Sequence, residues 1–107
     1  MHFSRIQVGL TDTRNRVIEQ TRQGQVELRA ALDQTEVAKR QVSLANDELV
    51  LAQDRFRTGV TDNIEVVAAQ DSLARANDAQ IAALFRYSIA RAQLARAVGA
   101  VGRTYIP

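Results

Sequence analysis

The sequence predicts an all-α fold, a long antiparallel coiled-coil hairpin of two helices joined by one short bend. The first observation is that alanine returns every seventh residue along two stretches of the chain: Ala31, Ala38, Ala45 and Ala52, then Ala69, Ala76, Ala83, Ala90 and Ala97. The second is that a larger residue stands three positions before each alanine, which completes a heptad seam. Alanine at a seam lets two helix axes approach closely. The seven-residue pattern is interrupted once, and there the chain is expected to turn back.

The first part of the hairpin is predicted from residue 25 to residue 58. Residues 1–24 carry a weaker pattern, in which Ile6, Val8 and Leu10 alternate as in a short strand but are interrupted by Gly9 and polar residues. We expect an irregular or frayed start over 1–24 that leads into the helix. The larger seam residues that follow are Leu28, Thr35, Val42, Leu49 and Phe56.

The bend is predicted at residues 59–62. Gly59 is able to adopt the left-handed conformation that ends a helix. Val60, which follows it, is able to fold back on the last helical turn. Asp62 and Glu65 have the spacing of a capping box immediately before an apolar run. Stop and start signals lie within a few residues of each other, and so short a connection forces the two helices to run antiparallel.

The second helix is predicted over 63–98, with Gly99 and Gly102 ending it and residues 101–107 forming a tail. In antiparallel layering, a large seam residue of one helix faces an alanine of the other, which fills the gap without strain. The geometry of the turn decides the register. The expected layers are Phe56 with Ala69, Leu49 with Ala76, Val42 with Ala83, and Leu73 with Ala52.

Each helix also carries a second apolar stripe, away from the alanine seam. The stripe residues are Ala30, Val37, Leu44 and Leu51 on the first helix and Val67, Ala74, Ile81 and Ala95 on the second, with Phe85, Ile89 and Ala92 further round. Helices that are apolar on two sides are buried on two sides. The pattern fits a wall of helices that closes into a tube and equally a four-helix bundle made from two hairpins.

Composition excludes several classes of function. The chain of 107 residues has no cysteine, so disulfides and thiolate metal sites are excluded. No apolar run approaches the roughly 20 residues that span a bilayer, and the first 24 residues lack the apolar core of a signal peptide. The formal net charge is +2, but residues 47–78 sum to −4 and residues 79–107 to +4. The arginines are interleaved with alanines and acids, so no nucleic-acid partner is expected.

No enzyme activity, cofactor or metal is expected. The single histidine, His2, lies at the terminus, and the sequence shows no nucleophile with a base, no metal-ligand cluster and no phosphate-binding glycine loop. Asp62 and Glu65 are interpreted as helix caps rather than as a catalytic pair. Gln80 and Tyr87 interrupt the seam, where polar residues set the register of a coiled coil.

The bend and the helix after it resemble the C-terminal helical hairpin of the TolC family of outer-membrane efflux proteins. The family pattern is an aromatic residue, two further residues, a glycine, a short polar stretch and a helix start of the type V-[VL]-x-A-Q. This chain has Phe56, Gly59, Val66-Val67 and Ala69-Gln70 at these places. The resemblance extends over roughly residues 26–100.

The resemblance implies a function and partners. Members of that family are trimers whose helices form a periplasmic α-barrel continuous with an outer-membrane β-barrel, and whose bends meet a periplasmic adaptor protein in a tripartite pump that exports small molecules. The adaptor-docking turn would comprise Phe56, Arg57, Thr58, Gly59, Val60, Thr61, Asp62 and Asn63. The best-known member has a tyrosine and an arginine, which serve its closed gate, where this chain has Phe56 and Thr61. The hydroxyl and the cation of such a gate are therefore missing.

Full-length members have two helical repeats and barrel strands, so this chain is interpreted as a fragment that is incomplete alone, resident in the outer membrane and periplasm, and paired with like hairpins. The alternative interpretation is a stand-alone dimeric coiled-coil scaffold or interaction module.

Overall fold

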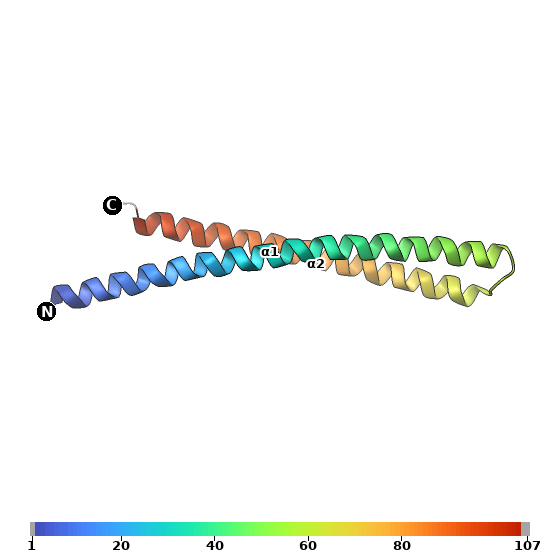
Figure 1. The fold of residues 1–107 in the computed structure, drawn as a ribbon, viewed down its shortest axis with the longest axis horizontal. Coiled ribbons are helices and arrows are strands. Elements are labelled where there is room, and N and C mark those ends of the chain that lie inside the picture. The colour runs from blue at the N-terminus through green and yellow to red at the C-terminus, as the bar shows by residue number, and fades with distance from the viewer. Residues whose placement is uncertain (1, 106–107) are drawn as a thin grey trace. The chain divides into compact units, whose positions relative to one another are not determined.

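Two α-helices make up nearly all of the described chain. In the computed structural model, α1 spans His2–Arg57 and α2 spans Asn63–Tyr105, with residues 58–62 between them (Figure 1). The structure describes the backbone of residues 2–105 and the side chains of residues 3–103; Met1, Ile106, Pro107 and the side chain of His2 lie outside it. No strand occurs within that described range. The predicted all-α class is confirmed.

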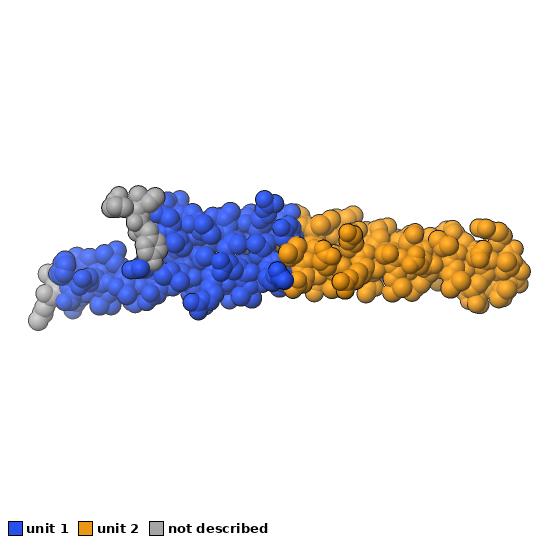
Figure 2. All heavy atoms as spheres, turned by 45° about the horizontal axis from the view of Figure 1, so that its top comes forward, with its two compact units in different colours: residues 1–31, 87–107 blue, residues 32–86 orange. Residues whose placement is uncertain are grey.

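The helices contribute to two compact units. Unit 2 is Leu32–Arg86, and unit 1 combines Met1–Ala31 with Tyr87–Pro107 (Figure 2). Unit 2 has a net charge of −3 and unit 1 a net charge of +5. Each unit contains one stretch of α1 and one of α2, and each is a two-helix layer without a third element.

Unit 2 is an antiparallel helical hairpin with alanines along its seam. Its buried apolar residues are Ala38, Ala45, Ala52 and Ala83, of which Ala83 is only 2% exposed. The larger residues between them, such as Val42 and Leu73, are half-buried. Small side chains bring the two backbones close, so they become fully covered while the larger ones lie at the edges of the seam.

The register of unit 2 follows from the position of the bend. α1 ends at Arg57 and α2 begins at Asn63, so residues about equally far from Val60 on either side, to within two positions, face each other. An ion pair between Arg55 Nε and Glu65 Oε2, 3.1 Å apart, joins two such positions. Counting by heptads from the contact between Gly24 and Leu94, three heptads along each helix, places Ala45 opposite Leu73, and Leu49 then faces Ala69.

The register expected from the sequence is therefore wrong by one heptad. Pairing Phe56 with Ala69, Leu49 with Ala76, Val42 with Ala83 and Leu73 with Ala52 requires a bend centred beyond Asp62, inside the cap of α2. Phe56 is 50% exposed rather than packed in the seam. Large residues still face alanines after the shift, because both seams repeat with the same seven-residue period.

Unit 1 has its own seam, in which a glycine takes the place of alanine. Gly24 is buried, and a Cβ at this position would lie 3.2 Å from Leu94 Cδ1 and 3.6 Å from Leu94 Cα. Ala90 is buried one turn earlier on α2. The absence of a side chain at Gly24 thus lets the backbone of α1 come close to Leu94 of α2 in unit 1.

The irregular start expected over residues 1–24 is a wrong prediction, since α1 is helical from His2 onward. Gly9 has no positive φ and does not break the helix. The hydroxyl of Thr13 donates a hydrogen bond to the Gly9 carbonyl oxygen at 2.9 Å. The hydroxyl of Thr21 donates one to the Val17 carbonyl oxygen at 3.1 Å. A helix satisfies its backbone locally, whereas the strand suggested by Ile6, Val8 and Leu10 would need a partner strand.

The other helix boundaries also differ from those expected. α1 ends at Arg57 rather than 58, and α2 continues to Tyr105, through most of the expected tail 101–107. Gly99 and Gly102 remain helical because neither adopts a positive φ. Glycine inside a helix costs roughly 1 kcal/mol relative to alanine. That cost weakens the helix without ending it.

Both units leave large apolar side chains exposed on the sides of the helices away from the seam. Leu44 and Leu51 are exposed on α1 within unit 2, and Ile81 and Phe85 are each 66% exposed on α2. None of the described helix segments is both long enough and apolar enough to cross a membrane. These faces are available to other helices.

Replacement of Ala83 by leucine should destabilise the hairpin. The larger side chain has no space in a seam position that is 2% exposed, so the free energy of unfolding should fall by about 1–3 kcal/mol. Thermal unfolding followed by circular dichroism measures this change. Ala79→Leu, on an exposed position of the same helix, is the matched control and should change stability by less than about 0.5 kcal/mol.

Candidate functional site: the bend and a basic groove

The bend begins with a helix C-cap formed mainly by backbone atoms, to which the Thr58 hydroxyl adds hydrogen bonds to the Asp54 and Arg55 carbonyl oxygens at 3.1 Å and 3.2 Å. Gly59 has φ of +78°, the left-handed region. Its N–H donates to the Phe56 carbonyl oxygen at 3.1 Å, and the Val60 N–H donates to that of Arg55 at 2.9 Å. These two hydrogen bonds are the pair that defines a Schellman motif, which satisfies carbonyls left free at the end of α1.

The bend ends with an N-cap on α2. Asp62 Oδ1 accepts a hydrogen bond from the Ile64 N–H at 3.1 Å, as a capping carboxylate does. The Glu65 carboxylate does not complete the reciprocal half of the predicted capping box in the described structure. Its carboxylate instead accepts from Arg55 Nε, so it joins the two helices across the bend.

Seven of the eight residues predicted to form the docking turn are exposed, and Thr61 is half-buried. Phe56 and Val60 are apolar side chains that face solvent, with Val60 65% exposed. The hydrogen bonds that stabilise the bend come largely from the backbone. The apolar side chains of Phe56 and Val60 are therefore accessible to another molecule.

A shallow hollow adjoins the bend on the first turns of α2. It has a volume of about 540 Å³ and is lined by Asn63, Ile64, Val67, Ala68 and Asp71. Ile64 and Val67 are both exposed. The predicted turn included only Asn63 of this set. The apolar run after the cap is the sequence feature that indicates this hollow. In the sequence analysis, Val67 of that run was interpreted as part of the second apolar stripe.

The charged groups of the bend are arranged for capping and pairing rather than for catalysis. Arg57 Nη1 lies 4.0 Å from Asp54 Oδ1, and Arg55 pairs with Glu65. No group of three metal-ligating side chains occurs in the described part of the chain. Phe56 and Thr61 lack the hydroxyl and the cation that would support a gate built like that of the best-known TolC-like protein.

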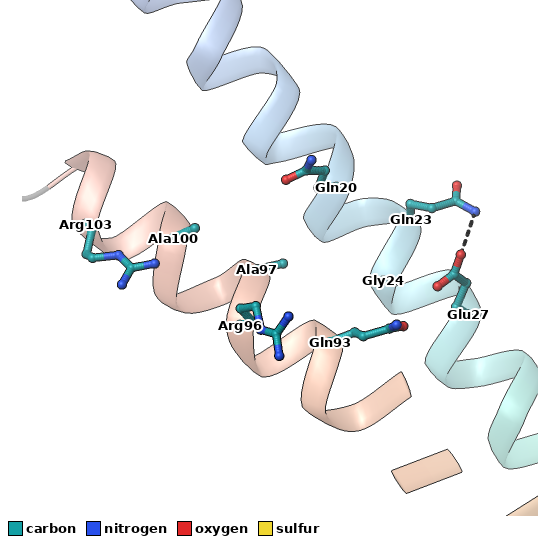
Figure 3. Close-up of a pocket in the computed structure, with 9 residues that line it drawn as sticks. All are labelled: Gln20, Gln23, Gly24, Glu27, Gln93, Arg96, Ala97, Ala100 and Arg103. Carbon is teal, nitrogen blue, oxygen red and sulfur yellow. Dashed lines mark hydrogen bonds between the residues drawn. The ribbon is translucent and has the colours of Figure 1, made fainter. Parts of the chain in front are cut away.

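A second candidate site is a groove in unit 1, between the two helices beside Gly24 (Figure 3). Its volume is about 540 Å³. Small residues form its floor, and polar side chains of both helices form its walls. The lining residues are Gln20, Gln23, Gly24, Glu27, Gln93, Arg96, Ala97, Ala100 and Arg103.

The electrostatic character of the groove is basic. Gln23 Nε2 donates to Glu27 Oε1 at 3.4 Å on the α1 wall, as Figure 3 shows. Arg96 and Arg103 stand one heptad apart on the α2 wall and make no ion pair within residues 3–103. The groove offers guanidinium groups to an anionic group. The sequence indicated only an excess of arginine in this region.

The family model described as outer membrane efflux protein matches residues 6–100. The chain belongs to this family. No curated protein and no solved structure matches the chain. The resemblance seen in the bend is thus confirmed, and the match begins well before it, within the segment that the sequence pattern left irregular. Outer membrane efflux proteins are export channels of the outer membrane rather than enzymes, and they assemble from several copies and contact adaptor proteins.

The structure places the alanines of the predicted helix-packing seam on the inner sides of the helices. Ala38, Ala45, Ala52, Ala83 and Ala90 are buried, and Ala31, Ala69 and Ala76 are half-buried. The docking turn lies in unit 2 and the basic groove in unit 1. The structure thus shows two surfaces, of which sequence reasoning identified one.

Substitution of Gly59 should destabilise the hairpin according to how well the new residue tolerates a positive φ. Gly59→Ala should lower the free energy of unfolding by about 1–2 kcal/mol, because Cβ is disfavoured in the left-handed region. Asparagine tolerates that region, so Gly59→Asn should cost only a few tenths of a kcal/mol. Urea unfolding of the two variants side by side measures the difference. If both variants lose the same free energy of unfolding, the positive φ of Gly59 does not determine the cost of substitution.

Gly24 should respond to substitution by size. Gly24→Ala should raise the free energy of unfolding by about 0.5 kcal/mol. An open helical glycine would gain roughly 1 kcal/mol from the same change. The gain is smaller at Gly24 because the Leu94 methyl must shift by a few tenths of an ångström. Gly24→Val should lower it by about 1–3 kcal/mol through overpacking. Gly99→Ala is the control, because nothing lies within 4 Å of the new Cβ. It should show the full gain in the free energy of unfolding, measured by thermal unfolding.

Proposed function

We propose that this chain forms a periplasmic segment of the helical tube of an outer-membrane efflux channel, and that the channel exports small molecules as part of a tripartite pump. The observation that carries this proposal is the family match over residues 6–100, which covers both helices and the bend. The described chain is helical on both sides of the bend, as a helical tube wall requires.

The proposed assembly is a trimer in which like hairpins stand side by side. The apolar stripes support this arrangement, because Leu44 and Leu51 on α1 and Ile81 on α2 are exposed in the single chain. Two helices bury little apolar surface by themselves. Packing against neighbouring hairpins would cover both stripes and supply the missing burial.

The proposed contact with the periplasmic adaptor is the bend, from Phe56 to Asn63. Three features support it: the backbone hydrogen bonds that hold Gly59, the exposed apolar side chain of Val60, and the hollow beside Ile64. The contact would bury Val60 without any change in the bend.

Val60→Asp tests the docking role. The substitution places a charge on a side chain that is 65% exposed, so helicity and thermal stability should change little. Binding of the helical hairpin of a periplasmic adaptor from the same organism should weaken by about tenfold or more, which corresponds to roughly 1.4 kcal/mol. Isothermal titration calorimetry measures the affinity.

Val26→Asp is the matched control, since Val26 is 60% exposed on α1 in unit 1, outside the bend. It should leave adaptor binding unchanged. The docking role is wrong if Val60→Asp and Val26→Asp bind the adaptor equally well.

A further inference from the structure

Unit 2 carries two exposed apolar stripes, one on each helix. The residues of a stripe stand seven positions apart, so each stripe runs along one side of its helix. All of them are exposed in the single chain, and Ile81 is 66% exposed. We refer to Val37, Leu44 and Leu51 as the α1 stripe and to Val67, Ala74 and Ile81 as the α2 stripe.

The two stripes lie on opposite faces of the hairpin. The α1 stripe stands one position before each seam alanine, as Leu44 precedes Ala45. The α2 stripe stands one position after each larger seam residue, as Ala74 follows Leu73. Because the helices run in opposite directions, a step back on α1 and a step forward on α2 turn in the same sense when both are viewed from one end. The two seams face each other, so the same turn leads to opposite faces.

This placement decides which kind of assembly covers both stripes. Two hairpins related by a two-fold axis pack a face on the same face of the other copy, so one of the two stripes stays exposed. In a head-to-tail contact, the α1 stripe of one copy packs on the α2 stripe of the next. That contact covers both stripes and repeats from copy to copy, as it does around a ring.

We propose that neighbouring copies of this chain pack head to tail, with the α1 stripe of one copy on the α2 stripe of the next and with their bends level. This inference rests on the proposed function, since a tube wall of like hairpins has all its bends at one end. A level neighbour holds its α2 at the height of the chain's own α2. Because Ala45 lies opposite Leu73 within unit 2, Leu44 then meets the partner's Ala74.

The other stripe contacts follow one heptad to either side of this one. Leu51 packs on the partner's Val67, and Val37 packs on the partner's Ile81. A shift of one heptad in either direction would set Leu51 or Val67 against the partner's bend, where no helix continues. The level arrangement therefore gives every residue of both stripes an apolar partner.

Polar residues along one edge of the stripes match in the same register. Charged side chains stand three positions after the α1 stripe residues, and amides stand four positions before the α2 stripe residues. Both sets are exposed. An amide donates to a carboxylate and accepts from a guanidinium, so each facing pair is able to form hydrogen bonds. The pairs are Asp54 with the partner's Asn63, Asp47 with the partner's Gln70, and Arg40 with the partner's Asn77.

The opposite edge has one pair of each kind. Gln41 faces the partner's Asp78, which is again an amide beside a carboxylate. Glu48 faces the partner's Asp71, a pair of like charges, but Arg75 lies 2.7 Å from the Asp71 carboxylate and offsets its charge. The polar edges thus favour the level register, and the apolar stripes supply the buried area.

Cysteine cross-linking tests the register, because the chain has no cysteine of its own. Leu44→Cys and Ala74→Cys are prepared as separate full-length proteins and oxidised with copper phenanthroline, alone and as an equal mixture. In the level arrangement, position 44 lies within the roughly 7 Å Cα separation that a disulfide requires from the partner's position 74. Val67→Cys and Ile81→Cys are the controls, since each lies one heptad, about 10 Å, along α2 from that position.

The expected result is a disulfide between positions 44 and 74 in the mixture, with little dimer in either protein alone or when Leu44→Cys is mixed with a control. A disulfide between two copies of position 44 would show a two-fold pair and overturn the proposal. Cross-links to position 67 or 81 in place of 74 would overturn the level register. Absence of all cross-links, with a monomeric mass by analytical ultracentrifugation, would overturn the stripe contact.

A charge in the stripe tests the contact itself. Leu51→Asp should weaken self-association about tenfold or more, because the new carboxylate would be buried against the partner's Val67. Val50→Asp is the matched control, since Val50 is 57% exposed and Leu51 61%, but Val50 lies on the other side of α1. It should associate as the original chain does. Equal association of the two variants in sedimentation would contradict the stripe contact.

Failure of this inference and failure of the proposed function are distinguishable. The stripe variants are measured by self-association, whereas the docking role is measured by the adaptor affinity of Val60→Asp. Leu51→Asp leaves Val60 and the rest of the bend intact. A chain that binds the adaptor but fails to cross-link would retain the proposed docking role and lose the stripe contact.

Discussion

The close approach of two antiparallel helices at alanine seams is the constraint on which the rest of this structure depends. Alanine at Ala38, Ala45, Ala52 and Ala83 leaves no room between the backbones, so these small residues become the buried core while larger residues lie at the seam edges. The gain in apolar burial is modest because alanine contributes little surface. Close packing therefore supplies a definite geometry but leaves large apolar residues on the other sides of both helices.

The bend ends that geometry with an exposed surface. Gly59 and Val60 close the end of α1 with backbone hydrogen bonds, and Asp62 opens α2 with one carboxylate contact. The Arg55–Glu65 ion pair then joins the helices next to the bend, although half-exposed pairs of this kind contribute little stability. Because few side chains are used to hold the bend, Phe56 and Val60 remain on its surface. A turn held in this way leaves apolar groups exposed.

Membership of the outer membrane efflux protein family gives the exposed faces a functional meaning. A helical tube requires helices that are apolar toward neighbours on more than one side, and the stripes containing Leu44 and Ile81 meet that requirement. The chain thus has one exposed apolar surface at the bend and others that run along its helices.

The sequence by itself determined the helical class, the heptad seams, the left-handed glycine and the cap at Asp62, because these depend on local conformation and on a period that repeats along one chain. It misplaced the helix ends at Gly9, Gly99 and Gly102, since glycine only weakens a helix whose hydrogen bonds and neighbours are intact. The sequence did not determine the register. A seven-residue repeat matches itself after every shift of one heptad. Only the length and position of the bend distinguish an arrangement with Leu49 facing Ala69 from one with Leu49 facing Ala76. The tertiary structure likewise decided the basic groove, because its two walls come from distant parts of the chain that meet only where Gly24 lets Leu94 approach.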